Sequence, residues 1–159
     1  MTLQIRAARK TDVPLIARLI RDLARYEKLE HEVTMTEEKV DRALFGKRPY
    51  AETLIAEEDE EALGFALFFH NFSTFLAQPG LYLEDLYVVP AARGKGVGRA
   101  LLERLAQIAI ERECGRLEWA VLNWNQDAIR FYERLGAKPN SEWTVYRLAG
   151  EHLRALARK

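Results

Sequence analysis

The sequence contains one cysteine, Cys114, in 159 residues, which excludes an internal disulfide. Its 24 basic residues balance 24 acidic ones, so net charge favours neither nucleic acid nor an anionic membrane surface as a partner. No apolar run approaches the roughly 20 residues that span a bilayer, and the first residues lack the basic-then-apolar pattern of a signal peptide. The three histidines are scattered without metal-ligand spacing. We therefore expect a cytoplasmic protein with no metal, no nucleic acid and no membrane among its partners.

Nearly half of the residues are apolar and no linker divides them, which predicts a single domain over residues 1–159. Strands are predicted at 3–7, 53–57, 63–72, 81–89, 117–122 and 144–148. Helices are predicted to follow caps at Thr11 or Asp12, at Thr36 and at Asn125, to begin at Val97, and to cover 151–157. A strand hairpin followed by a helical crossover predicts an α/β fold with a mixed sheet.

The chain is organised around residues 81–109, where a buried strand leads through a glycine-rich turn into an amphipathic helix. Gly94, Gly96 and Gly98 let the backbone turn sharply and leave N–H groups uncovered at a helix start. Because unpaired donors and the helix dipole favour negative charge there, this turn is predicted to cradle a phosphate.

The charges of the central strand are its two carboxylates, Glu84 and Asp85. Strict alternation divides the strand into two faces, one with Tyr82, Glu84, Leu86 and Val88 and the other with Leu83, Asp85, Tyr87 and Val89. The two carboxylates are therefore expected to point in opposite directions.

Two common phosphate loops do not match the glycine-rich turn. A P-loop requires Ser or Thr after Gly-Lys, and Gly94-Lys95 is followed by Gly96. A dinucleotide-binding fingerprint requires a third glycine where this sequence has Arg99 or Leu101, depending on the starting glycine.

The pattern that matches is Arg/Gln-x-x-Gly-x-Gly/Ala, here Arg93, Gly96 and Gly98, after the strand sequence Leu-Glu-Asp-Leu-Tyr-Val-Val-Pro. A second segment, residues 125–137, matches Asn-x-x-Ala-x-x-Phe-Tyr-x-x-x-Gly-Ala/Phe at the expected distance. Together they resemble the GNAT superfamily of N-acetyltransferases. The resemblance implies a mostly antiparallel sheet with helices on both faces, and acetyl-CoA as co-substrate.

The resemblance also implies roles for individual residues. Tyr132 stands where such enzymes protonate the leaving thiolate, and Glu84 where a group accepts the amine proton. Alternatives from the residues themselves are a packed aromatic for Tyr132 and an ordinary buried acid paired with a cation for Glu84. The predicted acetyl-CoA contacts are Leu86, Tyr87, Val88, Arg93, Gly94, Lys95, Gly96, Val97, Gly98, Arg99, Asn125 and Ala128.

Over nearly its full length the sequence resembles the diamine (spermidine/spermine) acetyltransferases and their thialysine-acetylating relatives. The predicted amine contacts are Tyr26, Glu27, Glu84, Asp85, Glu118 and Trp119. A solvated acidic loop is the alternative for Glu27 and its neighbours. Asn123 replaces a glutamate of the diamine enzymes, so a lysine-like amine such as thialysine is at least as plausible as a long polycation.

We therefore predict an acetyl-CoA-dependent N-acetyltransferase that acts on a primary amine of a small metabolite by direct transfer in a ternary complex. The alternatives are a protein or peptide acetyltransferase and a non-catalytic acetyl-CoA sensor. The family resemblance implies a homodimer with the C-terminal strand region at its interface.

Overall fold

The computed structural model describes residues 2–158. Internal contacts divide the chain into two compact units, one extending to Ala120 and one beginning at Val121. The first unit holds the sheet and three α-helices, and the second holds two α-helices and the segments that flank them. No helix in the part of the chain described has the length and apolarity that a membrane crossing requires.

In the first unit, the strands are β1 (Gln4–Ala7), β2 (Glu52–Glu58), β3 (Glu61–Ser73), β4 (Gln78–Val88) and β5 (Leu117–Trp119). The α-helices are α1 (Val13–Tyr26), α2 (Glu37–Phe45) and α3 (Val97–Glu111), and the 3-10 turns are η1 (Lys10–Asp12), η2 (Glu30–Glu32) and η3 (Pro90–Ala92). The Thr36 hydroxyl caps α2 by accepting from the Lys39 N–H, as predicted.

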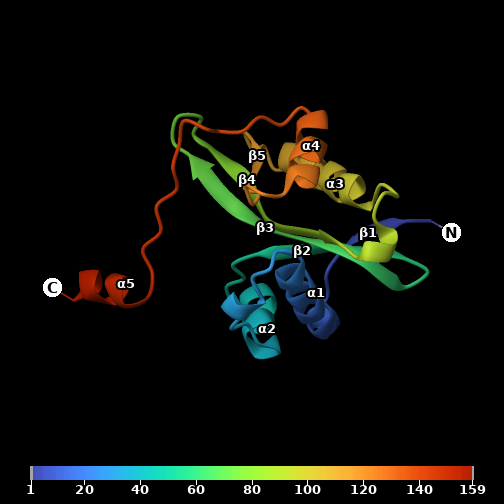
Figure 1. Cartoon of the computed structure of the whole chain (residues 1–159), viewed down its shortest axis with the longest axis horizontal. Helices are drawn as coiled ribbons and strands as arrows, with labels where there is room; N and C mark the ends of the chain where they lie inside the picture. Colours follow the sequence, from blue (N-terminus) through green and yellow to red (C-terminus); the bar gives the residue numbers. More distant parts are fainter. Residues whose placement is uncertain (1, 159) are drawn as a thin grey trace. The chain divides into compact units, whose positions relative to one another are not determined.

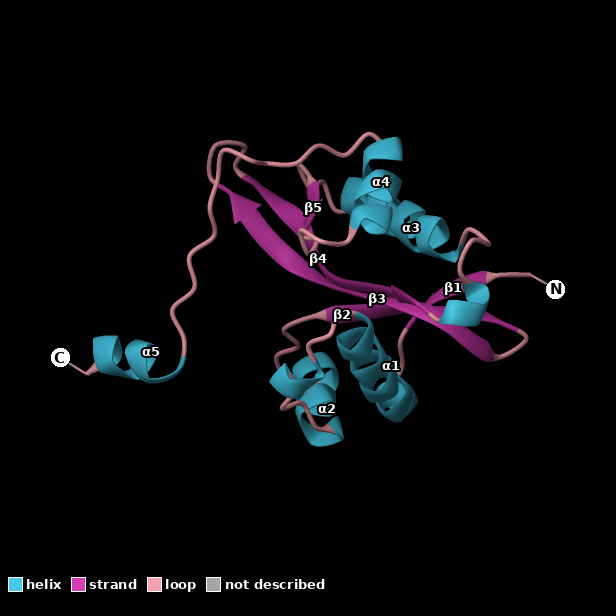
Figure 2. Ribbon diagram, in the orientation of Figure 1, coloured by secondary structure: helices cyan, strands magenta, loops and turns pink. Residues whose placement is uncertain are grey.

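The strands form one sheet in the order β1-β2-β3-β4-β5. Neighbouring strands are antiparallel from β1 to β4, and β5 runs parallel to β4 after the α3 crossover. Helices α1 and α2 lie against one face and α3 lies against the other (Figures 1 and 2). The predicted mixed, mostly antiparallel sheet with helices on both faces is confirmed.

The face beneath α1 and α2, here called the helix-pair face, carries one hydrophobic core cluster. Ile55, Phe65 and Tyr87 of the sheet are buried there against Ile16 and Leu19 of α1. On the α3 face, Phe68, Leu81 and Leu83 are buried, as are Leu101 and Leu105 of the helix. The burial of two aliphatic rows explains why α1 and α3 form where the 3.6-residue period predicts them.

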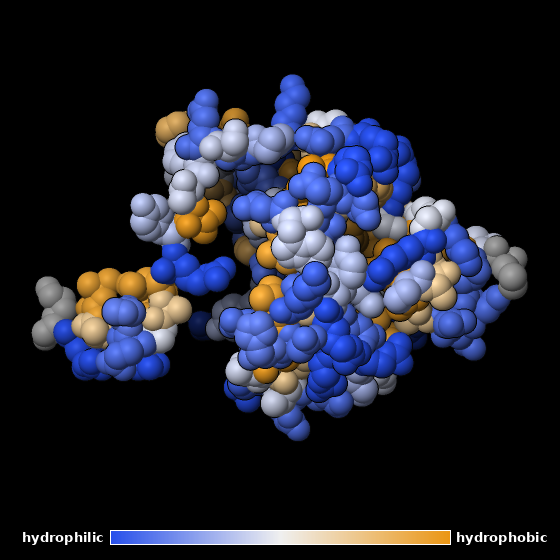
Figure 3. All heavy atoms as spheres, viewed as in Figure 1, coloured by the Kyte–Doolittle hydropathy of each residue, from blue (hydrophilic) through white to orange (hydrophobic). Residues whose placement is uncertain are grey.

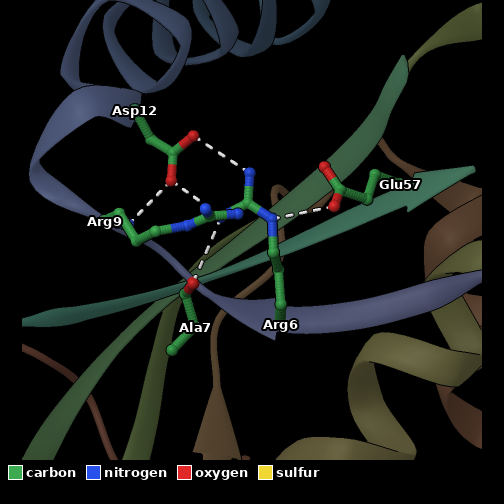
Figure 4. Close-up of polar contacts among 5 residues, drawn as sticks. All are labelled: Arg6, Ala7, Arg9, Asp12 and Glu57. Carbon is green, nitrogen blue, oxygen red and sulfur yellow. Dashed lines mark hydrogen bonds and ion pairs between the residues drawn. The ribbon is translucent and has the colours of Figure 1, made fainter. Parts of the chain in front are cut away.

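A partly buried ion-pair network connects β1, β2 and the start of α1 (Figure 4). Both terminal nitrogens of Arg6 donate to the Asp12 carboxylate, at 2.8 and 3.0 Å, and its Nε donates to Glu57 at 2.9 Å. The Arg9 N–H also donates to Asp12, at 2.7 Å. The Arg6 hydrogen bonds lower the pKa of Asp12. Asp12 therefore stands at the predicted cap position, but its side chain is used by Arg6 and Arg9 and does not cap α1.

In the second unit, α4 covers Gln126–Arg134 and α5 covers Gly150–Ala157. The strand predicted at 144–148 is not formed, and β5 ends at Trp119 and does not extend to residue 122. Val145 and Tyr146 are 90% and 93% exposed. Their β-branched and aromatic side chains favour a strand, but a strand requires a neighbouring backbone, and none pairs with them among residues 2–158.

Candidate active site

The central strand β4 contains a β-bulge at Glu84. In the register with β3, Leu83 pairs with Phe68 and Asp85 pairs with Leu67, which leaves Glu84 as an extra residue without a partner position. Glu84 is exposed on the surface of the strand. A bulge of this kind re-aims side chains at the point where it occurs.

The bulge overturns the predicted division of β4 into two faces. Because cross-strand partners share a face, Asp85 and Tyr87 lie on the helix-pair face together with Tyr82. Leu83 lies on the α3 face, together with Leu86. The expectation that Glu84 and Asp85 point apart rested on strict alternation, which the extra residue interrupts.

Three carboxylates gather where α1 ends beside the bulge. Glu27 follows the last residue of α1, and its pKa is raised first by burial and then by the charge of Glu84. Burial raises the pKa of Asp85 to about 7, and the charges of Glu84 and Glu27 add to this rise. Within residues 2–158 none of these acids forms an ion pair with a basic side chain. The cluster is therefore suited to an ammonium group, whose positive charge would relieve the repulsion.

A second polar group lies on the same face, one strand further along the sheet. Glu118 of β5 pairs with Tyr82 in the register, and its carboxylate accepts a hydrogen bond from the Asn71 side chain at 3.3 Å. Burial raises the pKa of Tyr82, and the charges of Glu84 and Glu118 raise it further. Trp119 pairs with Leu83 and so lies on the opposite face from Glu118.

Of the six predicted amine contacts, the structure therefore brings Glu118 to the same face as Asp85 and separates Trp119 from them. Tyr82 and Asn71 are the neighbours that sequence reasoning did not include. Tyr82 shares a face with Asp85 only because of the bulge, and Asn71 joins the group only through the pairing of β3 with β4, so neither could be found from strict alternation.

Among the residues described, the edge of β4 that faces away from β3 has no strand partner beyond Leu83, because the ladder with β5 covers Leu81–Leu83. The strand itself continues to Val88. A strand whose neighbour ends early presents main-chain donors along its open edge.

The direction of these donors follows from one hydrogen bond. The Val89 N–H donates to the Leu63 carbonyl of β3 at 2.9 Å. Because successive N–H groups alternate between the two edges of a strand, the Tyr87 N–H also points toward β3, and those of Leu86 and Val88 point to the open edge. Leu86 and Val88 can therefore polarise a carbonyl oxygen placed beside the edge, and Tyr87 cannot do so through its N–H.

The glycine-rich turn ends at the first residue of α3. Gly94 and Gly96 have positive φ values of 78° and 84°, and the space where a Cβ would stand is open at both. The first hydrogen bond of the helix runs from the Ala100 N–H to the Gly96 carbonyl. The N–H groups of Val97, Gly98 and Arg99 have no carbonyl four residues earlier within the helix to donate to. Such N–H groups at the start of a helix can donate to a phosphate.

The basic side chains of the turn differ in their surroundings. Arg99 forms an exposed ion pair with Glu103 at 2.7 Å. Lys95 is exposed. The Arg93 guanidinium lies over the rings of Tyr26 and Tyr87.

The remaining predicted site residues belong to the second unit. The Asn125 side chain is buried and accepts a hydrogen bond from the Ala128 N–H at 3.2 Å, so it caps α4 as predicted. Tyr132 lies on α4, half-buried, with its ring 5.5 Å from that of Phe131. The roles of all three in acetyl transfer stay predictions.

No group of three or more His, Cys, Asp and Glu side chains in the described part of the chain is arranged to hold a metal ion. The described first unit combines an anion cradle at a helix start, main-chain donors on an open strand edge and a cluster of acids. This arrangement fits the class of acyltransferases that take a phosphate-bearing thioester as donor and an amine as acceptor. The model of the acetyltransferase (GNAT) family matches residues 16–137, and the chain belongs to this family.

Characterised relatives cover nearly the whole chain. It is 38% identical over 165 residues to the thialysine N-epsilon-acetyltransferase of Mus musculus, covering 97% of this chain and 96% of the relative. It is 33% identical to the L-ornithine N5-acetyltransferase NATA1 of Arabidopsis thaliana, covering 96% of this chain and 87% of the relative. Among solved structures, an integron cassette protein from the mobile metagenome of V. cholerae aligns with a TM-score of 0.84 at 30% identity, covering 100% of this chain and 99% of that chain.

Proposed function

We propose that the chain transfers the acetyl group of acetyl-CoA to the primary amine of a small metabolite. The observation that carries this proposal is the acidic cluster of Glu27, Glu84 and Asp85 beside the open edge of β4, a short distance along the chain from the glycine-rich turn. Two relatives are named as acetyltransferases of thialysine and ornithine, and these names support a small amino acid with a side-chain amine as the substrate.

The proposed reaction proceeds by direct attack in a ternary complex. The amine nitrogen forms a bond to the thioester carbonyl carbon, and the bond from that carbon to sulfur breaks. Main-chain N–H groups of Leu86 and Val88 stabilise the negative charge that develops on the carbonyl oxygen. Glu84 accepts the proton of the amine, directly or through water, and Tyr132 protonates the thiolate of CoA.

Acetyl-CoA is held in this proposal by the turn and the start of α3. The pyrophosphate is bound by N–H groups of Gly96, Val97, Gly98 and Arg99, and the fit rests on the open space around Gly94 and Gly96. Gly94, Lys95, Asn125 and Ala128 complete the proposed set of contacts. No metal takes part in the proposed chemistry.

The amine is proposed to be short and to carry one or two positive groups. The acids near Glu84 receive the reacting ammonium group, and Glu118 and Tyr26 bind the rest of the molecule. A polyamine is the alternative substrate. One further relative is the human spermidine/spermine N(1)-acetyltransferase-like protein 1, to which this chain is 35% identical. The match covers 97% of this chain and 24% of that protein.

We further propose a homodimer whose interface includes the C-terminal segment. Support comes from apolar side chains that residues 2–158 leave exposed, on residues 143–148 and on α5, where Figure 3 shows a hydrophobic surface. A strand at 144–148 would form only with a backbone neighbour that a second copy can supply. A single domain over residues 1–159 and a cytoplasmic location complete the proposal.

The experiment that tests the proposed function measures CoA release from acetyl-CoA with thialysine, lysine, ornithine, putrescine, spermidine and a mixed peptide panel. We expect the highest kcat/KM with one of the three amino acids. Turnover only with peptides would replace the proposal with a protein acetyltransferase. Tight acetyl-CoA binding without any turnover would replace it with the sensor function.

A further inference from the structure

Arg93 begins the glycine-rich turn, yet its side chain makes its contacts with aromatic rings. The Cζ atom lies 4.8 Å from the centroid of the Tyr26 ring and 5.5 Å from that of the Tyr87 ring. Its Nε donates a hydrogen bond to the Val88 carbonyl at 2.9 Å. A guanidinium at these distances from two ring faces is held by cation–π attraction.

The two rings also contact each other. Tyr26 and Tyr87 meet edge to face, with centroids 6.5 Å apart and planes at 62°. Tyr87 is 6% exposed and belongs to the hydrophobic core, whereas Tyr26 is 38% exposed and ends α1. Arg93 and the buried ring of Tyr87 therefore both contact the more exposed ring of Tyr26.

This arrangement joins two segments that are distant in the sequence. Arg93 leads directly into the cradle proposed for acetyl-CoA, and Tyr26 is followed by Glu27 of the acidic cluster proposed for the amine. The hydrogen bond to the Val88 carbonyl ties the Arg93 side chain to the end of β4.

We propose that Arg93 is a positioning residue for the amine. Its guanidinium holds the Tyr26 ring in place, and Tyr26 in turn contacts the amine substrate. A residue of the turn proposed to bind acetyl-CoA thereby positions a residue proposed to bind the amine. This inference rests on the proposed function and deepens it, because it assigns the Arg93 side chain to the amine side. The phosphates are then bound by the main chain of the turn and by Arg99, whose side chain lies in the first turn of α3.

The first test compares Arg93→Met with Arg99→Met. Arg93→Met removes the cation at similar length, and we expect the KM for the amine to rise about threefold to tenfold while the Kd for acetyl-CoA stays within about twofold of wild type. Arg99→Met is expected to do the reverse. Arg93→Lys, which keeps a cation but loses the planar group, is expected to recover part of the amine KM.

A double-mutant cycle with Tyr26→Leu separates positioning from direct binding. If Arg93 acts through Tyr26, Arg93→Met changes the amine KM much less in the Tyr26→Leu background than alone. Additive effects would overturn the inference. So would an Arg93→Met protein whose acetyl-CoA Kd rises while its amine KM equals that of wild type, because Arg93 would then bind phosphate only.

A measurement without turnover keeps this inference distinct from the proposed function. In protein labelled with 3-fluorotyrosine, the ¹⁹F signal of Tyr26, assigned with Tyr26→Phe, is expected to shift in Arg93→Met. It is expected to stay in place in Arg104→Met, which removes a guanidinium that pairs with Glu111 on α3. An unchanged Tyr26 signal in Arg93→Met would overturn the inference, even if the wild-type protein is an active acetyltransferase. A shifted Tyr26 signal would support the inference, even if the wild-type protein shows no acetyltransferase activity.

Discussion

At the scale of single residues, Asp85 has an unusual protonation equilibrium. Its pKa is raised from 3.8 to about 7 by burial first and by the neighbouring acids second. Between these two values the folded chain holds a proton that the unfolded chain has lost. The free energy of unfolding therefore falls as the pH rises across this range and stays low above it.

Asp85→Asn is expected to remove this loss, because the amide is neutral at every pH and has the same shape. At pH 8 the variant should be more stable than wild type by on the order of 4 kcal/mol, and near pH 4 the difference should be small. Thermal and urea unfolding at both pH values measure it. The control is Asp127→Asn, an exposed acid paired with Arg130, for which we expect no such pH dependence. Equal stability of Asp85→Asn and wild type at pH 8 would contradict the raised pKa.

The proposed acid and base are tested by removing one functional group each. Tyr132→Phe and Glu84→Gln are expected to lower kcat about 100-fold, a typical contribution of a positioned proton donor or acceptor, with smaller changes in the acetyl-CoA Kd. Tyr50→Phe, at a tyrosine that is 78% exposed, is the matched control. Full turnover of either variant at neutral pH would remove that residue from the mechanism.

At the scale of elements, the glycine-rich turn depends on backbone shape. Gly96→Glu places a side chain and a negative charge at a residue with φ of 84°, next to the proposed phosphate site. We expect the acetyl-CoA Kd to rise at least about tenfold. Gly150→Glu makes the same change at another positive-φ glycine, the first residue of α5, and controls for backbone strain. Calorimetric titration that finds equal affinity in Gly96→Glu and wild type would show that the cradle lies elsewhere.

Elements with a clear period could be predicted from the sequence, and those decided by pairing could not. The 3.6-residue period and the Thr36 cap predicted α1 and α2 because those signals lie within the helices themselves. The bulge at Glu84 depends on how β4 registers with β3, and no residue of β4 records that register. The error in the β4 faces follows from this.

Asp12 illustrates a second limit of the same kind. Its type and position favour a helix cap, but Arg6 and Arg9 use its oxygens instead. Likewise, Val145 and Tyr146 favour a strand by side-chain type, yet residues 2–158 provide no backbone to pair with them. The motifs name the candidate site residues one by one, and the roles of these residues stay predictions, whereas the grouping of Glu118 with Tyr82 and Asn71 required the sheet.

At the scale of the whole molecule, the proposed homodimer can be tested with a substitution that weakens the dimer and leaves the stability of one copy unchanged. Val145 is 90% exposed, so Val145→Asp should not destabilise one copy. If the segment pairs with a second copy, burying the new charge should raise the dimer Kd at least about tenfold. Sedimentation velocity over a concentration series measures it, with Ile110→Asp as the control at a 77% exposed residue of α3. A monomeric wild type would contradict the proposal.

The most direct test of the central claim is mass spectrometry of the amine after incubation with the protein and acetyl-CoA. We predict one acetyl group on the side-chain amine of thialysine, lysine or ornithine, formed in equal amount to the CoA released, and less product with Gly96→Glu at an acetyl-CoA concentration below the wild-type Kd. Release of CoA without an acetylated amine, or acetylation only of added peptides, would contradict the account of a small-amine N-acetyltransferase.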